Sequence, residues 1–315
     1  MPGLRFGIHS GQQYESFSEL AGLWVRAEEL GLDWVSVFDH VRPPVGGPLG
    51  PCLEGPTALA ALATVTERVR CAILVAAVGW RHPAQLAHIS MTLDHISGGR
   101  FELGLGAGGP DDAHGEWGWV VPPRVERIHL LEETCRIVRS LWTNESTTIA
   151  GRHVSLNDAH MEPKPLQPAI PIVIGGSSRQ ILRVAVHYAT VWNALGGDIR
   201  QYRGAVRTME NECHLIGRSP ADLRQSVTFR AVLASTTIEL EKRMRGRFEA
   251  IPECDRREYI TIGTPASCVT ALEKYAEVGV RDFILAVRPP VDWPTLELFA
   301  TEVAPALRKR LAPQL

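Results

Sequence analysis

Apolar and polar positions alternate along the chain in two distinct rhythms. Short runs rich in β-branched residues, such as residues 4–9, alternate with longer segments in which apolar residues recur every three to four positions. The second rhythm is that of a helix with one buried face. In the first helical segment the apolar positions are Leu20, Leu23, Trp24, Ala27 and Leu30. Ser18 is its predicted N-cap and Gly31 its predicted C-terminal stop.

Eight apolar runs predict eight strands, most of them followed by a helix. The strands are expected at residues 4–9, 33–38, 69–78, 100–106, 170–175, 190–195, 226–234 and 282–287. Further helices are expected at residues 57–66, 83–96, 125–142, 179–188, 199–216, 240–248, 266–277 and 293–311. Strands with few polar alternations are typical of a parallel sheet covered by helices. Eight such units favour an α/β fold of the (β/α)₈ TIM-barrel type over an open sheet.

One stretch breaks this alternation. Residues 143–171 are irregular and carry three prolines in the sequence PKPLQP, which indicates an insertion with a small hairpin. The chain contains no Pro/Gly/Ser-rich linker and no shift in composition. We therefore expect a single domain covering residues 1–315.

Composition and charge exclude several classes of protein. With 45% hydrophobic and 22% charged residues, the chain is typical of a globular protein rather than a disordered one. The net charge of −2, without a long run of like charges, argues against a nucleic-acid surface or a polybasic membrane patch. No apolar run approaches about 18 residues, and the start of the chain lacks the pattern of a secretory signal.

The six cysteines form no C-x-x-C pair, and several lie in apolar or helical stretches. Reduced, buried thiols explain them better than disulfides or a zinc site. Together with the composition, this predicts a cytoplasmic protein.

In a TIM barrel, functional residues follow the carboxyl ends of the strands. After the fifth predicted strand, Gly175, Gly176, Ser177 and Ser178 lead directly into a helix. Glycines allow close approach of an anion to the backbone, hydroxyl groups donate hydrogen bonds, and a helix N-terminus carries partial positive charge. The turn therefore suits a phosphate group, although an ordinary capped turn accounts for it equally well.

The segment GLGAGG at residues 104–109 matches the dinucleotide-binding pattern G-x-G-x-x-G. In that pattern a helix begins within the motif, whereas here Pro110, Asp111 and Asp112 follow, which are loop residues. We therefore reject a Rossmann interpretation and expect the backbone to approach a planar ligand closely at this point.

Asp39 and His40 follow the second predicted strand, where a carboxylate and an imidazole can serve acid–base chemistry. A capping Asp and a half-exposed His are the plain alternative. Neither an H-E-x-x-H pattern nor a G-x-S-x-G elbow occurs, so we predict no metal ligands and disfavour a serine hydrolase. Three tryptophans either line an apolar pocket or pack in the core; they are Trp80, Trp117 and Trp119.

Four segments, taken together, resemble the bacterial luciferase-like superfamily. They are residues 26–40 (RAEELGLDWVSVFDH), 82–109 (HPAQLAHISMTLDHISGGRFELGLGAGG), 163–195 (PKPLQPAIPIVIGGSSRQILRVAVHYATVWNAL) and 262–285 (IGTPASCVTALEKYAEVGVRDFIL). The triplet Arg81-His82-Pro83 and the compact length look most similar to the branch of oxidoreductases that use the deazaflavin coenzyme F420.

The resemblance implies an oxidoreductase that transfers a hydride between coenzyme F420 and a small organic substrate. It also implies a homodimer. The alternative cofactor is FMN, reduced by a separate partner reductase, in a two-component monooxygenase. A non-catalytic ligand-binding barrel and a metal-dependent hydrolase are weaker alternatives.

The resemblance also implies roles for particular residues. A bulged third strand with a non-proline cis peptide would back the cofactor ring, two glycines would flank the ring, and the Gly-Gly-Ser-Ser turn would hold the phosphate. The residues implied for cofactor binding are Asp39, Leu74, Val75, Ala76, Gly106, Gly108, Gly175, Gly176, Ser177 and Ser178. His40 and Asp39 are the expected catalytic residues, with His40 as proton donor or acceptor.

From their positions after strands, the expected substrate-pocket residues are His9, Trp80, Trp117 and Arg288. One departure from the resemblance affects the substrate. Some deazaflavin dehydrogenases carry a catalytic Glu directly after the fourth-strand Gly-x-Gly, whereas the acids here are Asp111, Asp112 and, later, Glu116. This argues against a sugar-phosphate dehydrogenase and leaves the substrate open.

Overall fold

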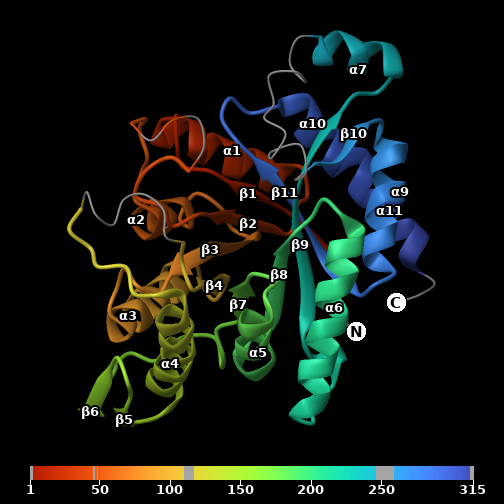
Figure 1. Ribbon diagram of the computed structural model, residues 1–315. Coiled ribbons are helices and arrows are strands. Elements are labelled where there is room, and N and C mark those ends of the chain that lie inside the picture. Colours follow the sequence, from red (N-terminus) through yellow and green to blue (C-terminus); the bar gives the residue numbers. More distant parts are fainter. Residues whose placement is uncertain (1–2, 45–46, 48, 110–116, 246–258, 313–315) are drawn as a thin grey trace.

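Eight parallel strands close into a barrel in the computed structural model, which describes residues 3–44, 47, 49–109, 117–245 and 259–312. The barrel strands are β1 (Arg5–Ser10), β2 (Trp34–Val37), β3 (Arg70–Ala77), β4 (Phe101–Gly106), β7 (Ile172–Gly175), β8 (Val191–Leu195), β9 (Arg224–Leu233) and β11 (Val280–Val287). Each pairs with the next in that order, and β11 pairs with β1 to complete the ring. The predicted (β/α)₈ barrel is confirmed (Figure 1).

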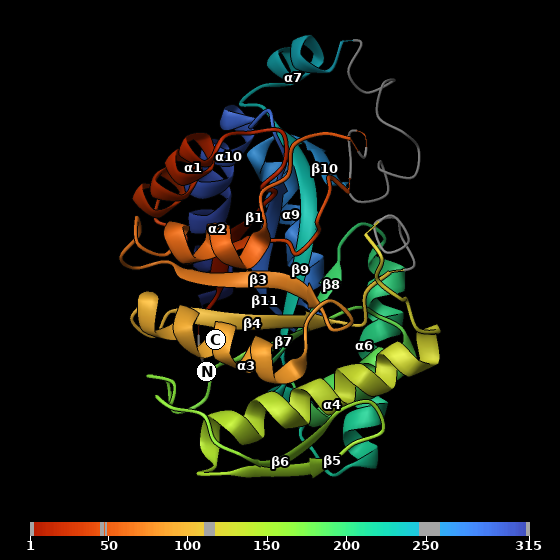
Figure 2. The same ribbon diagram turned by 90° about the vertical axis from the view of Figure 1, so that its left-hand side faces the viewer.

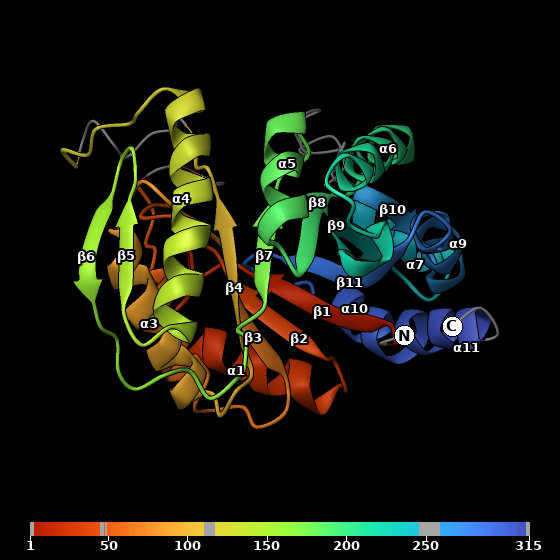
Figure 3. The ribbon, with the colours of Figure 1, turned by 90° about the horizontal axis from the view of Figure 1, so that it is seen from below.

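Helices lie around the barrel strands, as Figure 3 shows from below. They are α1 (Phe17–Glu29), α2 (Gly55–Leu62), α3 (Pro83–Ile96), α4 (Arg124–Thr143), α5 (Arg179–Tyr188), α6 (Ile199–Leu215), the short η1 (Pro220–Asp222), α7 (Thr237–Met244) and α9 (Pro265–Ala276). The predicted C-terminal helix at residues 293–311 is divided into α10 (Trp293–Leu298), the π-helical η2 (Phe299–Val303) and α11 (Ala304–Leu311). Among the helices of the described residues, none is long and apolar enough to cross a membrane.

The N-cap of α1 differs from the prediction. Ser16, not Ser18, caps the helix: its hydroxyl accepts a hydrogen bond from the amide of Glu19, and the Glu19 carboxylate accepts one from the amide of Ser16. This reciprocal capping box satisfies two amide groups at once, which one serine inside the first turn cannot do.

A ninth strand, β10 (Tyr259–Gly263), is absent from the sequence prediction. It pairs in parallel with the carboxyl end of β9, over Arg230–Leu233. Its five-residue run, YITIG, is too short to be distinguished from a buried turn by periodicity. The extra strand lies beside the carboxyl end of β9 and places Tyr259 at that end of the barrel.

A hairpin of β5 (Thr147–Ala150) and β6 (Ser155–Ala159) lies within the predicted insertion at residues 143–171. Figure 2 shows it beside α4, at the opposite side of the molecule from α7. The hairpin expected in the insertion is therefore confirmed, whereas the single-domain organisation over residues 1–315 stays a prediction.

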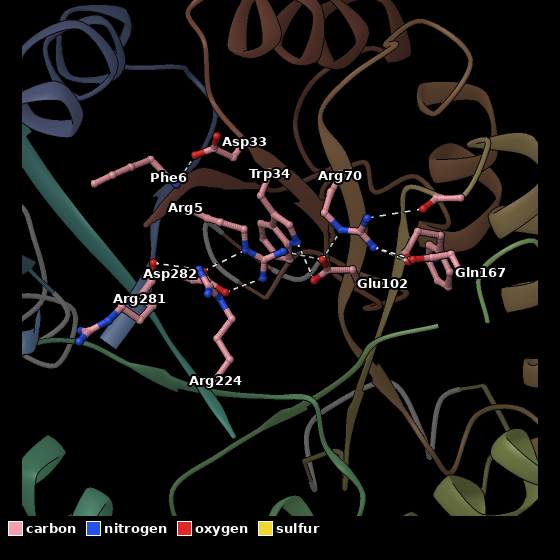
Figure 4. Close-up of polar contacts among 12 residues, drawn as sticks. Arg5, Phe6, Asp33, Trp34, Arg70, Glu102, Gln167, Arg224, Arg281 and Asp282 are labelled. Atoms are coloured by element: carbon pink, nitrogen blue, oxygen red, sulfur yellow. Dashed lines mark hydrogen bonds and ion pairs between the residues drawn. The ribbon is translucent and has the colours of Figure 1, made fainter. Parts of the chain in front are cut away.

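The amino ends of the strands are closed by a buried ionic cluster, which we call the basal cluster: Arg5, Arg70, Glu102, Arg224 and Asp282 (Figure 4). Glu102, 1% exposed, accepts hydrogen bonds from Arg5 and Arg70 and from the indole of Trp34. In the described part of the chain, charged side chains and Trp34 therefore fill this end of the barrel.

Candidate cofactor and active site

A cavity of about 1200 Å³ opens at the carboxyl ends of the barrel strands. Seven predicted site residues line it: His9, His40, Leu74, Val75, Gly175, Gly176 and Ser177. The prediction missed several others, among them Asn193, Gln201, Tyr202, Thr228 and Tyr259. Asn193 lies in the middle of β8, and nothing in the sequence singled it out, because its side chain is an ordinary polar group in an apolar run.

The inner wall of the cavity is built around Val75. A cis peptide joins Leu74 and Val75, and the pairing of β3 with β4 shifts between Ile73 and Ala76. The bulge and the non-proline cis peptide expected near Leu74–Ala76 are thus present. Ala76 itself is buried in the core and faces away from the cavity.

Two glycines leave room for the Val75 side chain. A Cβ atom at Gly106 would lie 2.6 Å from Cγ2 of Val75, and one at Gly175 would lie 3.0 Å from Cγ1. The first contact is closer than carbon atoms allow, so a larger residue at Gly106 would displace Val75, and the second is tighter than most carbon contacts. The strand-end glycines therefore permit an apolar bulge to protrude towards the cavity.

The turn before α5 has the features of an anion site. Gly176 has a φ of +123°, and its amide already donates to the carbonyl oxygen of Asn193 at 3.0 Å. Ser177 is exposed to the cavity. The hydroxyl of Ser178 is buried and has no hydrogen-bond partner within the described part of the chain, and Ser178 is the N-cap residue of α5. An orphaned hydroxyl beside the unpaired amides of a helix N-terminus fits a phosphate group.

Asp39 is only 3% exposed and is held by Arg81. The two guanidinium nitrogens of Arg81 donate to the two carboxylate oxygens at 2.6 and 3.1 Å, and Arg81 also contacts Glu54. Burial raises the pKa of Asp39, while Arg81 acts in the opposite direction. The carboxylate expected to contact the cofactor therefore faces a guanidinium that the prediction did not include.

His40 lines the cavity and begins an aromatic series. Its ring lies 5.4 Å from that of Phe38 and 6.1 Å from that of Trp80, both edge-on. Trp80 stacks on Trp119 at 5.8 Å, and Trp119 on Trp117 at 6.2 Å. The predicted pocket residues Trp80 and Trp117 are thus joined through Trp119, and Trp117, 61% exposed, ends the stack at the surface.

His9 lines the same cavity beside His40. Its Nδ1 lies 2.8 Å from the hydroxyl of Ser36. Burial, followed by the charges of Arg288 and His40, lowers the pKa of His9 to about 3. The imidazole is therefore neutral near pH 7. Arg288 lines an adjoining cavity of about 220 Å³, which shares Tyr259 with the large one.

The loop after β4 is only partly described. Gly108 has a φ of +71°, and its carbonyl oxygen accepts a hydrogen bond from the buried side chain of Arg127. Neither Gly106 nor Gly108 is among the residues lining the large cavity. Asp111, Asp112 and Glu116 lie outside the described residues.

The chain belongs to the luciferase-like monooxygenase family, whose model matches residues 3–245. This confirms the predicted family. It is 28% identical, over 98% of its length and 99% of the relative's, to an F420-dependent glucose-6-phosphate dehydrogenase of Microbacterium testaceum.

Solved structures share the fold over nearly the whole chain. An F420-dependent secondary alcohol dehydrogenase in complex with an F420–acetone adduct superposes with a TM-score of 0.83 at 18% identity, covering 97% of this chain and 99% of the other. A riboflavin lyase with modified FMN and riboflavin gives a TM-score of 0.85 at 17% identity, covering 98% and 92%. The fold thus occurs with either class of cofactor.

Proposed function

We propose that the protein is an oxidoreductase that uses coenzyme F420 to transfer a hydride to or from a small organic substrate. The observation that carries this proposal is the pairing of an apolar bulge with an anion site along one cavity. Val75 and Ser177 line this cavity and would offer an apolar surface to a flat ring and a hydroxyl group to a phosphate. The buried hydroxyl of the adjacent Ser178 has no hydrogen-bond partner in the described residues. The F420-dependent relative that matches along almost the full chain supports the same cofactor.

In this proposal Leu74 and Val75 would hold the ring of the deazaflavin, and Gly175–Ser178 with the first turn of α5 would hold its phosphate. Gly106 and Gly108 shape the loop beside the ring. When bound, the deazaflavin supplies a hydride donor or acceptor. Asp39 is proposed as a positioning residue. Both of its carboxylate oxygens accept hydrogen bonds from Arg81, which would fix the segment after β2 that carries His40.

His40 is the proposed catalytic proton donor or acceptor, because it is the imidazole that lines the cavity next to the aromatic series. A His can hold or release a proton near neutral pH. His9, held neutral by burial, is proposed to orient the substrate by a hydrogen bond. Trp80, whose ring lies edge-on to that of His40, would shield the imidazole from water on one side.

The substrate is proposed to be a small molecule bound between His9, Trp80, Trp117 and Arg288. The sugar phosphate of the relative's name is not carried over, since the acids that follow Gly109 depart from the dehydrogenase pattern. We further propose a cytoplasmic homodimer, served by a separate reductase that regenerates the reduced cofactor.

A titration with coenzyme F420 and with FMN, each followed through the cofactor's own fluorescence, tests the proposal. We expect saturable binding of F420 and weaker binding of FMN. Ser177→Asp places a negative charge at the phosphate position and should weaken F420 binding by about tenfold or more. Ser155→Asp, on the exposed hairpin, is the matched control and should leave the affinity unchanged.

Tight FMN binding without F420 binding would replace the proposal by the alternative, a two-component FMN monooxygenase, which the structural likeness to an FMN-containing protein favours. Binding of neither would point to a non-catalytic barrel. His40→Ala should retain F420 affinity, because His40 is assigned to proton transfer and not to cofactor retention.

A further inference from the structure

A second group of potential ligands lies far from the cavity, where the hairpin meets α4. Glu126, His129 and His153 each offer one ligand atom, and these atoms lie within 4.8 Å of one another. Glu126 and His129 are three residues apart on α4, and therefore on one face of the helix. His153 comes from the turn between β5 and β6.

The backbone beneath this cluster is held in place by a neighbouring carboxylate. Glu133, a buried residue one helical turn further along α4, accepts hydrogen bonds from the amides of Arg152, His153 and Val154 at 2.6, 3.0 and 3.1 Å. Three such bonds fix the turn against the helix. The His153 ring is thus presented to α4 by a prearranged backbone, which is what a metal site requires.

The spacing of the ligand atoms suits a small transition-metal ion. An ion bound tetrahedrally at about 2.0 Å places its ligand atoms about 3.3 Å apart. Nε2 of His153 already lies 3.2 Å from Oε2 of Glu126. The ligand atom of His129 lies within 4.8 Å of the other two, so its ring must move closer to complete the tetrahedral spacing.

The positively charged side chain of Arg152 lies between Glu126 and His129. The guanidinium of Arg152 donates to Oε1 of Glu126 at 2.6 Å and lies 3.2 Å from Nδ1 of His129. Its side chain is 60% exposed and can turn out into solvent. Exposed ion pairs contribute little stability, so an incoming divalent ion displaces Arg152 at small cost.

We propose that Glu126, His129 and His153 bind a divalent transition-metal ion, with zinc as the expected occupant and water as the fourth ligand. Two imidazoles and one carboxylate are a ligand set that zinc prefers. The ion would fasten the β5–β6 turn to α4, independently of the proposed redox function. The sequence alone gave no indication of it, because His153 follows His129 only after an intervening strand and turn.

The test is a calorimetric titration of the full-length chain with Zn²⁺. Cys52 and Cys254 are replaced by Ser to remove competing thiols, and chelator treatment removes bound metal beforehand. We expect one ion per chain, with His129→Ala and His153→Ala each weakening binding by about tenfold or more. His160→Ala, an exposed histidine of the same insertion, is the control and should leave binding unchanged.

Arg152→Ala should make zinc binding several-fold tighter, because it removes the competing cation. Co²⁺, titrated in the same way, should give the visible absorption of a tetrahedral site, lost in His153→Ala. Absence of saturable Zn²⁺ binding at about 100 μM would overturn the proposal. Binding that His129→Ala and His153→Ala leave unchanged would overturn it as well, since the ion would then lie elsewhere.

Discussion

At the scale of single residues, the neighbours of a side chain decide its role. Asp39 and His40 are adjacent in sequence, yet the Asp39 carboxylate faces Arg81 and the His40 ring lines the cavity. A strand-end Asp-His pair suggests two catalytic groups. Only the fold reveals that one of them already has a charged partner, which comes from the loop after β3.

The pKa of His9 leads to a pH-dependence of stability. The folded-state pKa of about 3 lies below the value of 6.5 for an unperturbed His, so the unfolded chain binds a proton that the folded chain does not. His9 therefore contributes stability above pH 6.5, and this contribution is lost as the pH falls from 6.5 towards 3.

We expect the free energy of unfolding of the wild type to fall, between pH 7 and pH 5, by at most about 2 kcal/mol more than that of His9→Asn. Urea unfolding at the two pH values measures the difference. His160→Asn, at an exposed site, serves as the control. Equal losses in the wild type and in His9→Asn would contradict the neutral state assigned to His9.

At the scale of elements, helix ends illustrate how local rules compete. Both Ser16 and Ser18 precede the apolar face of α1, and Ser18 lies nearer to it. The S-x-x-E spacing that begins at Ser16 decides the cap, because Glu19 returns the hydrogen bond.

We expect Ser16→Ala to lower the free energy of unfolding by about 1 kcal/mol, since it removes the cap. Ser18→Ala, two residues further on, should change it by less than about 0.5 kcal/mol. Urea denaturation of the two variants compares them directly. If Ser18→Ala lowered the free energy of unfolding more than Ser16→Ala, Ser18 would be the N-cap after all, as the periodicity alone predicts.

The barrel strands and most helices were predictable, because strands such as β2 and β4 are buried on both faces and helices such as α1 bury one face. The pattern for α3 (Pro83–Ile96) and α5 (Arg179–Tyr188) gives their bounds directly from a proline and a serine pair. The site was less predictable. Val75 was anticipated through family resemblance, and Gly175 and Ser177 already from the turn that precedes α5. Asn193 and Thr228 line the cavity only because the barrel brings their strands together.

At the scale of the whole molecule, the two ends of the barrel differ in how their polar groups are paired. The basal cluster satisfies buried charges with one another, while the other end keeps polar groups available to a ligand. Removing one member of a buried ionic network leaves its partners uncompensated, which costs more than the network itself contributes.

Glu102→Gln should therefore lower the free energy of unfolding by about 3–5 kcal/mol, because Arg5 and Arg70 lose their shared carboxylate. Glu273→Gln, in a more exposed pair with Arg310, should cost less than about 1 kcal/mol. Chemical denaturation measures both. Because Glu102 lies at the closed end, F420 affinity of the folded variant should stay unchanged; a loss of affinity without a loss of stability would refute this separation.

The position of β11 between β9 and β1 affects how the chain folds during synthesis. β11 lies between β9 and β1, and Arg5 and Asp282, which pair across that junction, are 277 residues apart in sequence. During synthesis, β1 and the part of β9 that pairs with β11 cannot gain this partner until residues 280–287 have been made. Unpaired strand edges invite association with other chains. We therefore expect the nascent chain to be prone to association with other chains until β11 joins the barrel.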